Sequence, residues 1–464
     1  MSPTNPTLWK SIQQFDLDAP LSDYCFSVRL AHENSWPENF VRKAIEEYKK
    51  FMYLAAVSDS MVSPSEIIDV VWHQHLIFTQ SYTDFCKLLG KKIEHIPSTK
   101  KQSEFETFKK AKELTTELYA RNFGNAPTEI WAYSDLYEPL QMPKSRFKPA
   151  EVSLICVLVL LAAAVPLYFI LKPVYSIIHG QDFLAPYLIV LVCCYLFLFL
   201  VNRSLFSRLL DKLSDDSFIF HLNGLELYHF KANGINDVIH AGVNSLIDSD
   251  KLEINAKSKL VIKAKAKAST PMEVAVLETV KKYSGHAYKQ MFQALKGKPV
   301  FKNVTEISSA LQKYVVKSSF FCRLHALNLT ILGLVLLAGL IRLGIGLFHG
   351  KPVLFLVITL LVVGASIFLH IKNLYQYFES ALVKYYERNI IPNAQAGSEQ
   401  WKYYLTGSEA FVAAFIPLTY SANQVTPAKQ SGSGNSGGGS SCGSSCGSSC
   451  GSSCGGGCGG CGGD

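Results

Sequence analysis

A short stretch of the chain, DVVWHQHL at residues 69–76, holds side chains that can bind a metal ion. Asp69 and His73 are four residues apart, so they are neighbours on one face if the stretch is helical. His75 lies about 200° around the helix from His73, so the two histidines cannot bind one ion from the helix alone. A metal site therefore needs a distant ligand, and His95, in the sequence EHIP, is the candidate.

Two interpretations of the polar cluster Asp69, His73, His75 and His95 remain open. In the structural one, Asp69 holds the imidazole of His73 in one tautomer while Trp72 and His75 pack against neighbouring helices. In the functional one, the cluster is a metal site, where a carboxylate commonly orients a ligating imidazole. The sequence favours the structural interpretation, because it lacks the cysteine pairs and the H-E-x-x-H spacing that mark zinc sites.

The element that carries these side chains is expected to be one helix over residues 64–89. The sequence SPSE at 63–66 offers Ser63 as the capping hydroxyl, a proline at the first helical position and a carboxylate at the third. Apolar residues at helical spacing predict further helices over 37–57 and 103–124. Residues 1–148 are therefore expected to form a helical soluble domain.

The motifs of this domain resemble a known family. They are PSEIIDVVWHQHLIFTQSYTDFC, the following HIP, and YARNFGNAPTEIWAY. The D-x-x-W-H-x-H-L core, Tyr82 and the F-G-x-x-P-x-x-I-W segment are similar to the N-terminal domain of the glycine-rich-domain-containing proteins of plants and bacteria. The resemblance covers about residues 5–135. It implies a shared fold unit and brings no assigned reaction with it.

Four long apolar blocks predict a polytopic membrane protein, and they hold the excess of apolar residues in a chain that is 48% hydrophobic. Each block has at most one charge and is long enough to cross a hydrocarbon layer of roughly 30 Å as a helix. The blocks form two close pairs. They are VSLICVLVLLAAAVPLYFIL at 152–171, LAPYLIVLVCCYLFLFLV at 184–201, ALNLTILGLVLLAGLI at 326–341 and PVLFLVITLLVVGASIFLHI at 352–371.

Lysine and arginine residues crowd the outer flanks of each pair of spans, whereas the short connections within the pairs hold few. By the positive-inside rule, both termini and the loop 202–325 lie in the cytoplasm of a multi-pass protein of the cell (inner) membrane. The first residues lack a basic stretch followed by an apolar one, so we expect no cleavable signal peptide. The net charge of +8 suits contact with an anionic leaflet of the lipid bilayer. Arg342, alone within the apolar blocks, is expected to reach the outer surface.

The loop between the two pairs of spans has the element order of a winged helix. A short helix, a turn at Asn233 and Gly234, and a helix over 236–249 precede expected strands over 251–254 and 257–268. The lysine-rich second strand could contact nucleic acid, but the second helix has no lysine or arginine for phosphates. Nucleic acid is therefore an unlikely partner, and we expect a module that binds protein partners.

The last residues are glycine, serine and cysteine, a composition that predicts disorder. The thiolates could bind a soft ion such as Cu(I) or Zn(II). Alternatively, they are substrates of a cysteine-modifying enzyme or sites of lipidation, and the sequence does not choose among these. The layout of the whole chain also resembles that of uncharacterised bacterial multi-span membrane proteins with a Gly/Cys-rich tail. The six tail cysteines are Cys442, Cys446, Cys450, Cys454, Cys458 and Cys461.

The expected fold class is mostly α, with a winged-helix-like α+β insertion and a disordered tail. Walker, Rossmann and nucleophile-elbow motifs are absent from the sequence. The expected function is a non-enzymatic, membrane-anchored scaffold or adaptor that displays the tail for soft-metal handling or modification. The alternative is a metal-dependent enzyme with its site at Asp69, His73 and His95. The expected parts are the soluble domain 1–148, spans at 149–201 and 326–372, the insertion 202–325, a helical C-terminal segment 373–427 and the tail 428–464.

Overall fold

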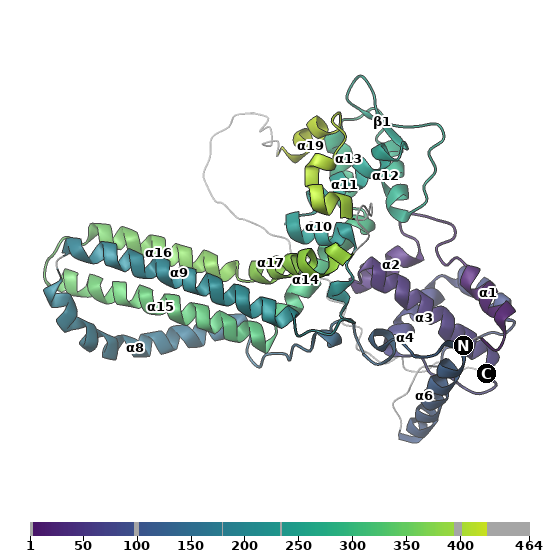
Figure 1. Cartoon of the computed structure of the whole chain (residues 1–464), viewed down its shortest axis with the longest axis horizontal. Coiled ribbons are helices and arrows are strands. Elements are labelled where there is room, and N and C mark those ends of the chain that lie inside the picture. The colour runs from purple at the N-terminus through teal and green to yellow at the C-terminus, as the bar shows by residue number, and fades with distance from the viewer. Residues whose placement is uncertain (1–2, 97–101, 179, 233, 394–400, 425–464) are drawn as a thin grey trace, which may run out of the picture.

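The structure is a computed structural model of the whole chain. It describes residues 3–96, 102–178, 180–232, 234–393 and 401–424. This part of the chain is mostly helical, with one small two-stranded sheet. Four long helices form a bundle, and the remaining elements gather at one end of it (Figure 1).

The N-terminal domain is built around its long third helix, which contacts four others. Glu47 lies in the core of this domain, 2% exposed, and its carboxylate accepts hydrogen bonds from the Tyr119 hydroxyl and from Trp131 Nε1, both at 2.8 Å. Lys50 Nζ donates to the same carboxylate at 2.7 Å. One buried acid thus ties three helices together. The helices are α1 (Pro6–Gln14), α2 (Phe26–Asn34), α3 (Glu38–Val57), α4 (Glu66–Ile77), α5 (Thr79–Leu89), α6 (Gln102–Phe123) and α7 (Thr128–Trp131).

The single helix expected over 64–89 is divided into α4 and α5, with the break at Phe78. Phe78 leaves the helical conformation, and its ring packs edge-on against Phe26 of α2. The helix begins at Glu66, two residues later than expected, because the hydroxyl of Ser65 rather than Ser63 accepts the capping bond from Ile68 N. Tertiary packing therefore accompanies the break at Phe78, whereas the start of the helix depends on a local capping bond.

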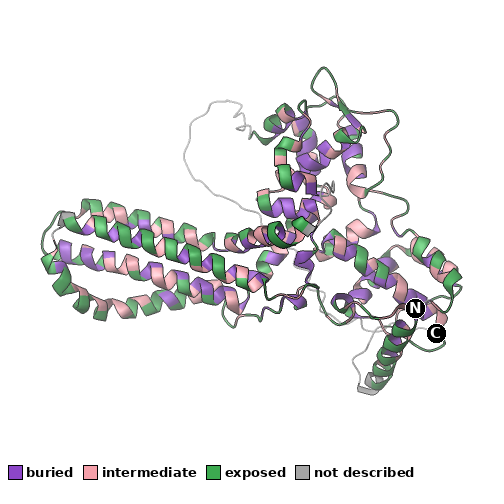
Figure 2. Ribbon diagram, viewed as in Figure 1, coloured by how far each residue is buried: buried purple, intermediate pink, exposed green. Residues whose placement is uncertain are grey.

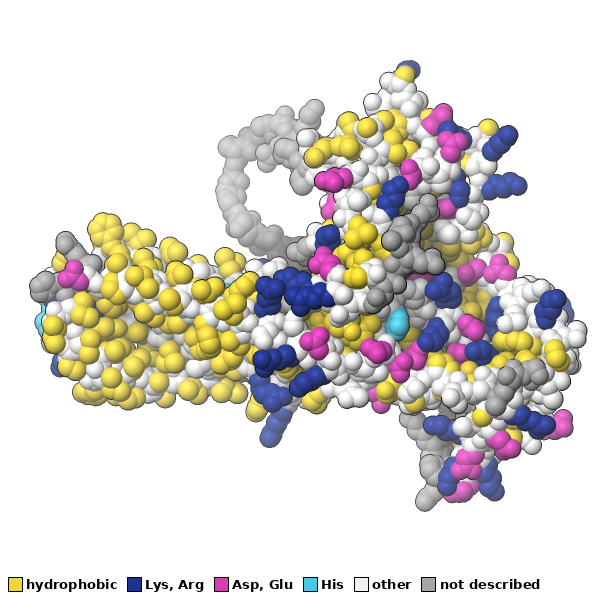
Figure 3. All heavy atoms as spheres, in the orientation of Figure 1, with side chains coloured by type: hydrophobic (Ala, Val, Ile, Leu, Met, Phe, Trp, Pro, Cys, Tyr) yellow, Lys and Arg dark blue, Asp and Glu magenta, His cyan; other side chains and the backbone are white. Residues whose placement is uncertain are grey.

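Among the described residues, four helices are long and apolar enough to cross a membrane. Helix α15 lies at the centre of the bundle and contacts the other three helices. In its most apolar stretch of 18 residues, 44% of the residues are buried, whereas the corresponding share in α8 is 6%. Apolar side chains cover the bundle surface, and lysine and arginine side chains gather where it meets the other domains (Figure 3). This agrees with a membrane protein. The helices are α8 (Pro149–Ile177), α9 (Gly180–Leu210), α15 (Ser319–Phe348) and α16 (Leu354–Lys372).

Polar side chains inside the bundle link its helices. Asn202 of α9 and Asn328 of α15 are both fully buried and exchange two amide hydrogen bonds of 2.9 Å. His370 Nε2 of α16 lies 2.9 Å from Asn328 Oδ1, which can only accept, so this nitrogen carries the proton. Arg342, expected to reach the outer surface of the membrane, packs against the end of α8. It is 5% exposed and donates to the carbonyls of Tyr175 and Ile178, because the end of α8 offers it unpaired acceptors.

The insertion between α9 and α15 begins with the predicted order of helix, helix and hairpin. The two strands pair antiparallel, with Glu253 opposite Val261. The second strand is shorter than expected and ends before Lys263, so Lys265 and Lys267 lie outside it. The assignment as a winged helix stays a prediction. The elements are α10 (Gly224–Ala232), α11 (Ile235–Asp248), β1 (Leu252–Ile254), β2 (Leu260–Ile262), α12 (Pro271–Lys282), α13 (Tyr288–Lys296) and α14 (Pro299–Val316).

The segment after the last span returns to cover the insertion. Asn244, buried on α11, donates to the Tyr403 hydroxyl at 3.1 Å and accepts from Val412 N at 2.8 Å. His240 of the same helix stacks on Phe292. Helix α11 is therefore an internal element. The returning segment comprises α17 (Gln376–Tyr385), a π-helical turn (Tyr386–Ile390), α18 (Lys402–Thr406), a 3-10 turn (Gly407–Ala410) and α19 (Ile416–Asn423).

The N-terminal domain docks on the insertion, mainly through α2 against α14. Asn303 Nδ2 of α14 donates to the carbonyl of Trp36 at 3.1 Å, and Glu226 of α10 accepts from the backbone N–H of Glu38 at 2.8 Å. A continuous cluster of buried apolar residues runs through both domains and the C-terminal segment (Figure 2). The soluble elements therefore share one core.

Candidate metal site

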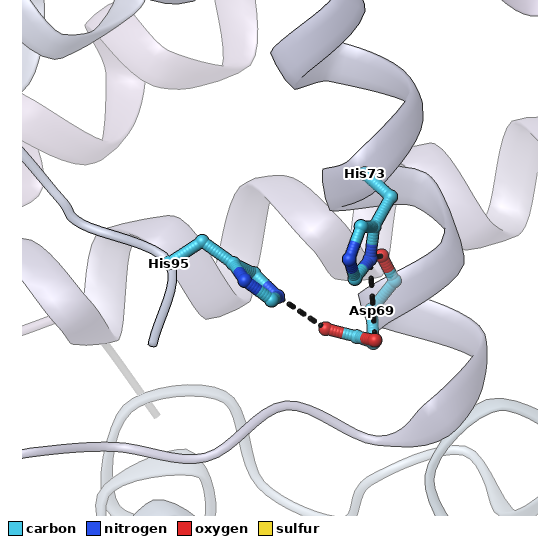
Figure 4. A group of neighbouring side chains, drawn as sticks. All are labelled: Asp69, His73 and His95. Atoms are coloured by element: carbon cyan, nitrogen blue, oxygen red, sulfur yellow. Dashed lines mark hydrogen bonds and ion pairs between the residues drawn. The ribbon is translucent and has the colours of Figure 1, made fainter. Parts of the chain in front are cut away.

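The structure brings together three of the four residues of the predicted cluster (Figure 4). Asp69 and His73 lie one turn apart on α4, and His95 comes from the loop that follows α5. Each residue offers one ligand atom, and these atoms all lie within 4.8 Å of one another. Within the described residues, this is the one group of at least three histidine, cysteine or acidic side chains with such spacing.

The carboxylate of Asp69 lies between the two imidazoles. His95 Nε2 is 2.9 Å from Oδ1, and His73 Nδ1 is 3.2 Å from Oδ2 and 2.9 Å from the backbone carbonyl of Asp69. A carboxylate accepts hydrogen bonds, so the ring nitrogens that face it carry protons in this arrangement. An ion bound by either nitrogen would displace that proton, which makes ion binding and protonation compete.

Aromatic side chains hold the loop that carries His95. The Tyr82 hydroxyl of α5 donates to the carbonyl of Ile93, and Trp72 Nε1 donates to the Tyr82 hydroxyl at 3.1 Å. The Trp72 ring also packs against His95, with ring centroids 4.7 Å apart. Lys91 Nζ donates to the carbonyl of Ser58 at 2.9 Å. The position of His95 is therefore fixed from several sides.

His75 does not join the cluster, in line with its position around the helix. It is fully buried, with Nδ1 2.8 Å from the Tyr48 hydroxyl and Nε2 3.1 Å from the Ser81 hydroxyl. Burial lowers the pKa of His75 to about 4, so this imidazole is neutral at physiological pH. Its ring contacts Phe26 and Phe85. Trp72 and His75 pack as the structural interpretation expected.

The cluster opens into a cavity of about 1,030 Å³. The side chain of His73 is 55% exposed, that of Asp69 38% and that of His95 16%. The cavity also has an apolar wall that includes Phe51 and Trp72. Because these side chains are exposed to solvent, packing contributes little to their stability. Any ion held here would keep coordination positions that solutes can reach.

The six tail cysteines predicted as soft-metal ligands, residues 442–461, all lie outside the described residues. The other cysteines are free, and four of them, Cys25, Cys86, Cys156 and Cys322, are buried.

Sequence reasoning singled out Asp69, His73 and His95 but did not assign roles to Trp72 and Tyr82 in placing His95. Both belong to the motif that carries the family resemblance, which is the signal that could have pointed to them. The break at Phe78 has no such signal in the local sequence.

Comparison with known proteins supports the predicted resemblance. A profile of the family described as UCP032817-like matches residues 10–116, which include the whole cluster. Glycine-rich domain-containing protein 1 of Arabidopsis thaliana is 28% identical over 116 residues. The N-terminal domain resembles the glycine-rich-domain-containing proteins. The match covers 24% of this chain and spans only 14% of the length of that relative, so it concerns this domain alone. No solved structure matches the chain.

Proposed function

We propose that this chain is a membrane-anchored metal protein whose N-terminal domain binds Zn(II) or Fe(II) through Asp69, His73 and His95. Two imidazoles with one carboxylate form a ligand set that proteins use for both ions. The observation that carries the proposal is the convergence of the three side chains in a solvent-open cavity, with His73 55% exposed. His75, whose role is packing, is instead fully buried.

An ion with three protein ligands keeps at least one position for water or substrate. Such an ion lowers the pKa of bound water and polarises oxygen atoms of a substrate, which supports hydrolytic chemistry. Glu66 and Glu94 also line the cavity and are the candidates for a general base. The proposal therefore extends to a metal-dependent enzyme that acts on a small molecule in this cavity.

The test uses the full-length chain with its six tail cysteines changed to serine, so that tail thiolates cannot contribute metal. Purified protein is dialysed against Zn(II), and the bound ion is counted by mass spectrometry. We expect about one ion per chain, and at least a tenfold loss of affinity in both His73→Ala and His95→Ala, since each removes a ligand. His286→Ala, at an exposed histidine outside the cluster, is the matched control. Binding should also weaken as the pH falls, because protons compete with the ion for the ligand atoms.

Asp69→Ala separates the two interpretations of the cluster. A structural role predicts a lower melting temperature with no metal bound by the parent protein. A metal site predicts loss of the ion, together with a loss of the extra stability that the ion confers on the parent. A parent protein without stoichiometric metal would refute the proposal.

The scaffold function expected from the sequence is the second candidate, and the tail composition supports it. In this case the tail thiolates bind Cu(I) or Zn(II), or a cysteine-modifying enzyme acts on them. The difference in bound metal between the native chain and the chain with its six tail cysteines changed to serine gives the number of ions that depend on the tail. A mass shift on tail peptides isolated from cells, without extra metal, would favour modification. The insertion would supply protein partners, and the burial of α11 argues against nucleic acid as its partner.

We also propose that both termini face the cytoplasm and that the bilayer is the cell (inner) membrane. The arrangement of the soluble elements at one end of the bundle supports a common side for them (Figure 1). Reporter fusions at 178, 260 and 424 test this. The first should report the outer side, and the other two should report the cytoplasm. A cytoplasmic signal at 178 would refute the orientation.

A further inference from the structure

A patch of basic side chains lies at the end of the bundle that faces the soluble elements, where lysine and arginine gather (Figure 3). It combines two segments that are far apart in the sequence, 143–148 before α8 and 317–323 at the start of α15. The metal site does not use this patch. The basic patch consists of Lys144, Arg146, Lys148, Lys317 and Arg323.

Backbone hydrogen bonds hold the two segments side by side. Ser145 N donates to the carbonyl of Lys317, and Ser319 N donates to the carbonyl of Pro143, both at 2.8 Å. Ser319 Oγ donates to the carbonyl of Lys144 at 3.2 Å. The basic residues that flank two separate spans in the sequence are therefore brought into one patch by the tertiary structure.

The protein does not balance the charge of this patch. All five side chains are exposed, and none of them forms an ion pair within the part of the chain that the structure describes. In the two segments and the first turns of α8 and α15, Glu151 is the one acidic residue. Its carboxylate accepts from the backbone N–H of Lys148 at 2.9 Å. Five positive charges beside one carboxylate attract an anion from outside the protein.

The two arginines are placed to bind a phosphate group. Arg323 Nε donates to the carbonyl of Ser319 at 3.2 Å, which anchors the side chain and leaves its terminal nitrogens without a partner among the described residues. The guanidinium carbon of Arg146 lies 5.8 Å from the ring centroid of Phe147, and this ring is 45% exposed. Guanidinium groups form paired hydrogen bonds with phosphate oxygens. Exposed aromatic rings at the start of a membrane span are typical of the head-group level of a bilayer.

The surface next to the patch indicates which kind of phosphate compound binds. Helix α8 continues from the patch into the bundle with exposed apolar side chains, such as Leu154 at 60% and Leu158 at 56%. A soluble anion would contact the charges alone, whereas a phospholipid also covers the apolar surface of α8. We propose that the basic patch binds the phosphate head group of an anionic phospholipid whose acyl chains lie along α8. This inference rests on the proposed placement of the bundle in a bilayer.

Native mass spectrometry of the full-length protein tests the proposal. Protein freed of lipid in a neutral detergent is titrated with cardiolipin, phosphatidylglycerol and phosphatidylcholine. We expect affinity to fall in that order, because five charges exceed the charge of one phosphate. Phosphatidylglycerol should bind at least about tenfold more tightly than phosphatidylcholine, since each basic residue near an anionic head group contributes roughly fivefold.

Removal of charge from the patch should remove this preference. The triple variant Arg146→Gln/Lys317→Gln/Arg323→Gln should bind phosphatidylglycerol at least about tenfold more weakly and leave the affinity for phosphatidylcholine unchanged. If this variant fails to fold, Arg146→Gln/Lys148→Gln serves, with a smaller expected loss. The matched control changes three exposed lysines of α6, outside the bundle, and should bind all three lipids as the parent does. The control is Lys109→Gln/Lys110→Gln/Lys112→Gln.

Three results would overturn the proposal. The first is equal affinity of the parent for all three lipids. The second is an equally large loss in Arg203→Gln/Arg208→Gln/Lys212→Gln, at exposed residues near the end of α9, because lipid would then respond to the total charge of this end of the bundle. The third is competition by glycerol phosphate as effective as that of the lipid, which would indicate a soluble phosphate ligand.

The same titration separates this inference from the proposals on which it rests. Phosphatidylcholine that binds as tightly as the anionic lipids would refute the role of the patch and leave the placement of the bundle in a bilayer intact. The absence of any lipid binding would contradict both. None of these results depends on the metal site.

Discussion

The contact between Glu226 and Glu38 predicts that the docking of the two soluble domains depends on pH. Glu226 is 3% exposed, and its carboxylate accepts hydrogen bonds of 2.8 Å from the backbone N–H groups of Glu38 and Asn223. Burial, with a smaller contribution from the nearby Glu38 carboxylate, nevertheless raises its pKa from the usual 4.5 to about 7. The protonated form is therefore favoured while the domains are docked.

The magnitude follows from the two pKa values. The difference, about 7 minus 4.5, is worth at most about 3 kcal/mol to docking at roughly 1.36 kcal/mol per pKa unit, a limit reached when undocking exposes Glu226 fully to water. The docked state binds the proton more tightly than the open state. Docking is therefore most stable below about pH 4.5, weakens as the pH rises to about 7, and changes little above that value. Between pH 5 and 8 the open fraction should therefore rise by at most roughly 50-fold to 100-fold.

Hydrogen exchange measured by mass spectrometry on the full-length protein is the assay, because the N–H of Glu38 is itself part of the contact. After correction for the intrinsic rate at each pH, protection at the start of α3 should fall between pH 5 and 8. Glu226→Gln cannot titrate and should flatten this slope, whatever its effect on absolute protection. His32 faces Glu306 across the same interface, so His32→Gln is the control. Equal slopes in the parent and Glu226→Gln would refute the reasoning.

Two further substitutions test the buried polar contacts. Glu47→Leu removes the acceptor shared by Tyr119 and Trp131, and the free energy of unfolding should fall by about 2–5 kcal/mol. The measurement is the melting temperature of the full-length protein. A melting temperature within 1–2 °C of the parent, roughly the error of the measurement, would contradict this role. Asn328→Leu breaks the amide pair with Asn202 and should cost about 1 kcal/mol, measured by titration of the folded bundle with a denaturing detergent. An unchanged midpoint would show that the pair does not stabilise the bundle.

The sequence by itself determined the features that depend on neighbouring residues. The four spans follow from the length of their apolar runs, and all four are helices of sufficient length and hydropathy. The separation of His75 from His73 follows from the helical period. In the structure, His75 lies in the core and His73 lines the cavity. Three helices of the N-terminal domain were predicted from the spacing of apolar residues; one of them is divided at Phe78, and α1, α2 and α7 were not predicted individually.

Contacts between distant residues were decided by the tertiary structure alone. Asp69 and His95 are 26 positions apart, and their approach depends on where α5 ends and on the bond from Tyr82 to Ile93. The burial of Arg342 depends on the end of α8, whose carbonyls lie more than 160 positions earlier in the chain. A cavity of about 450 Å³, lined in part by Asn303, exists only where the N-terminal domain docks on the insertion. Helical period and hydropathy act within a few residues, whereas burial and unpaired polar groups arise only when whole elements pack together.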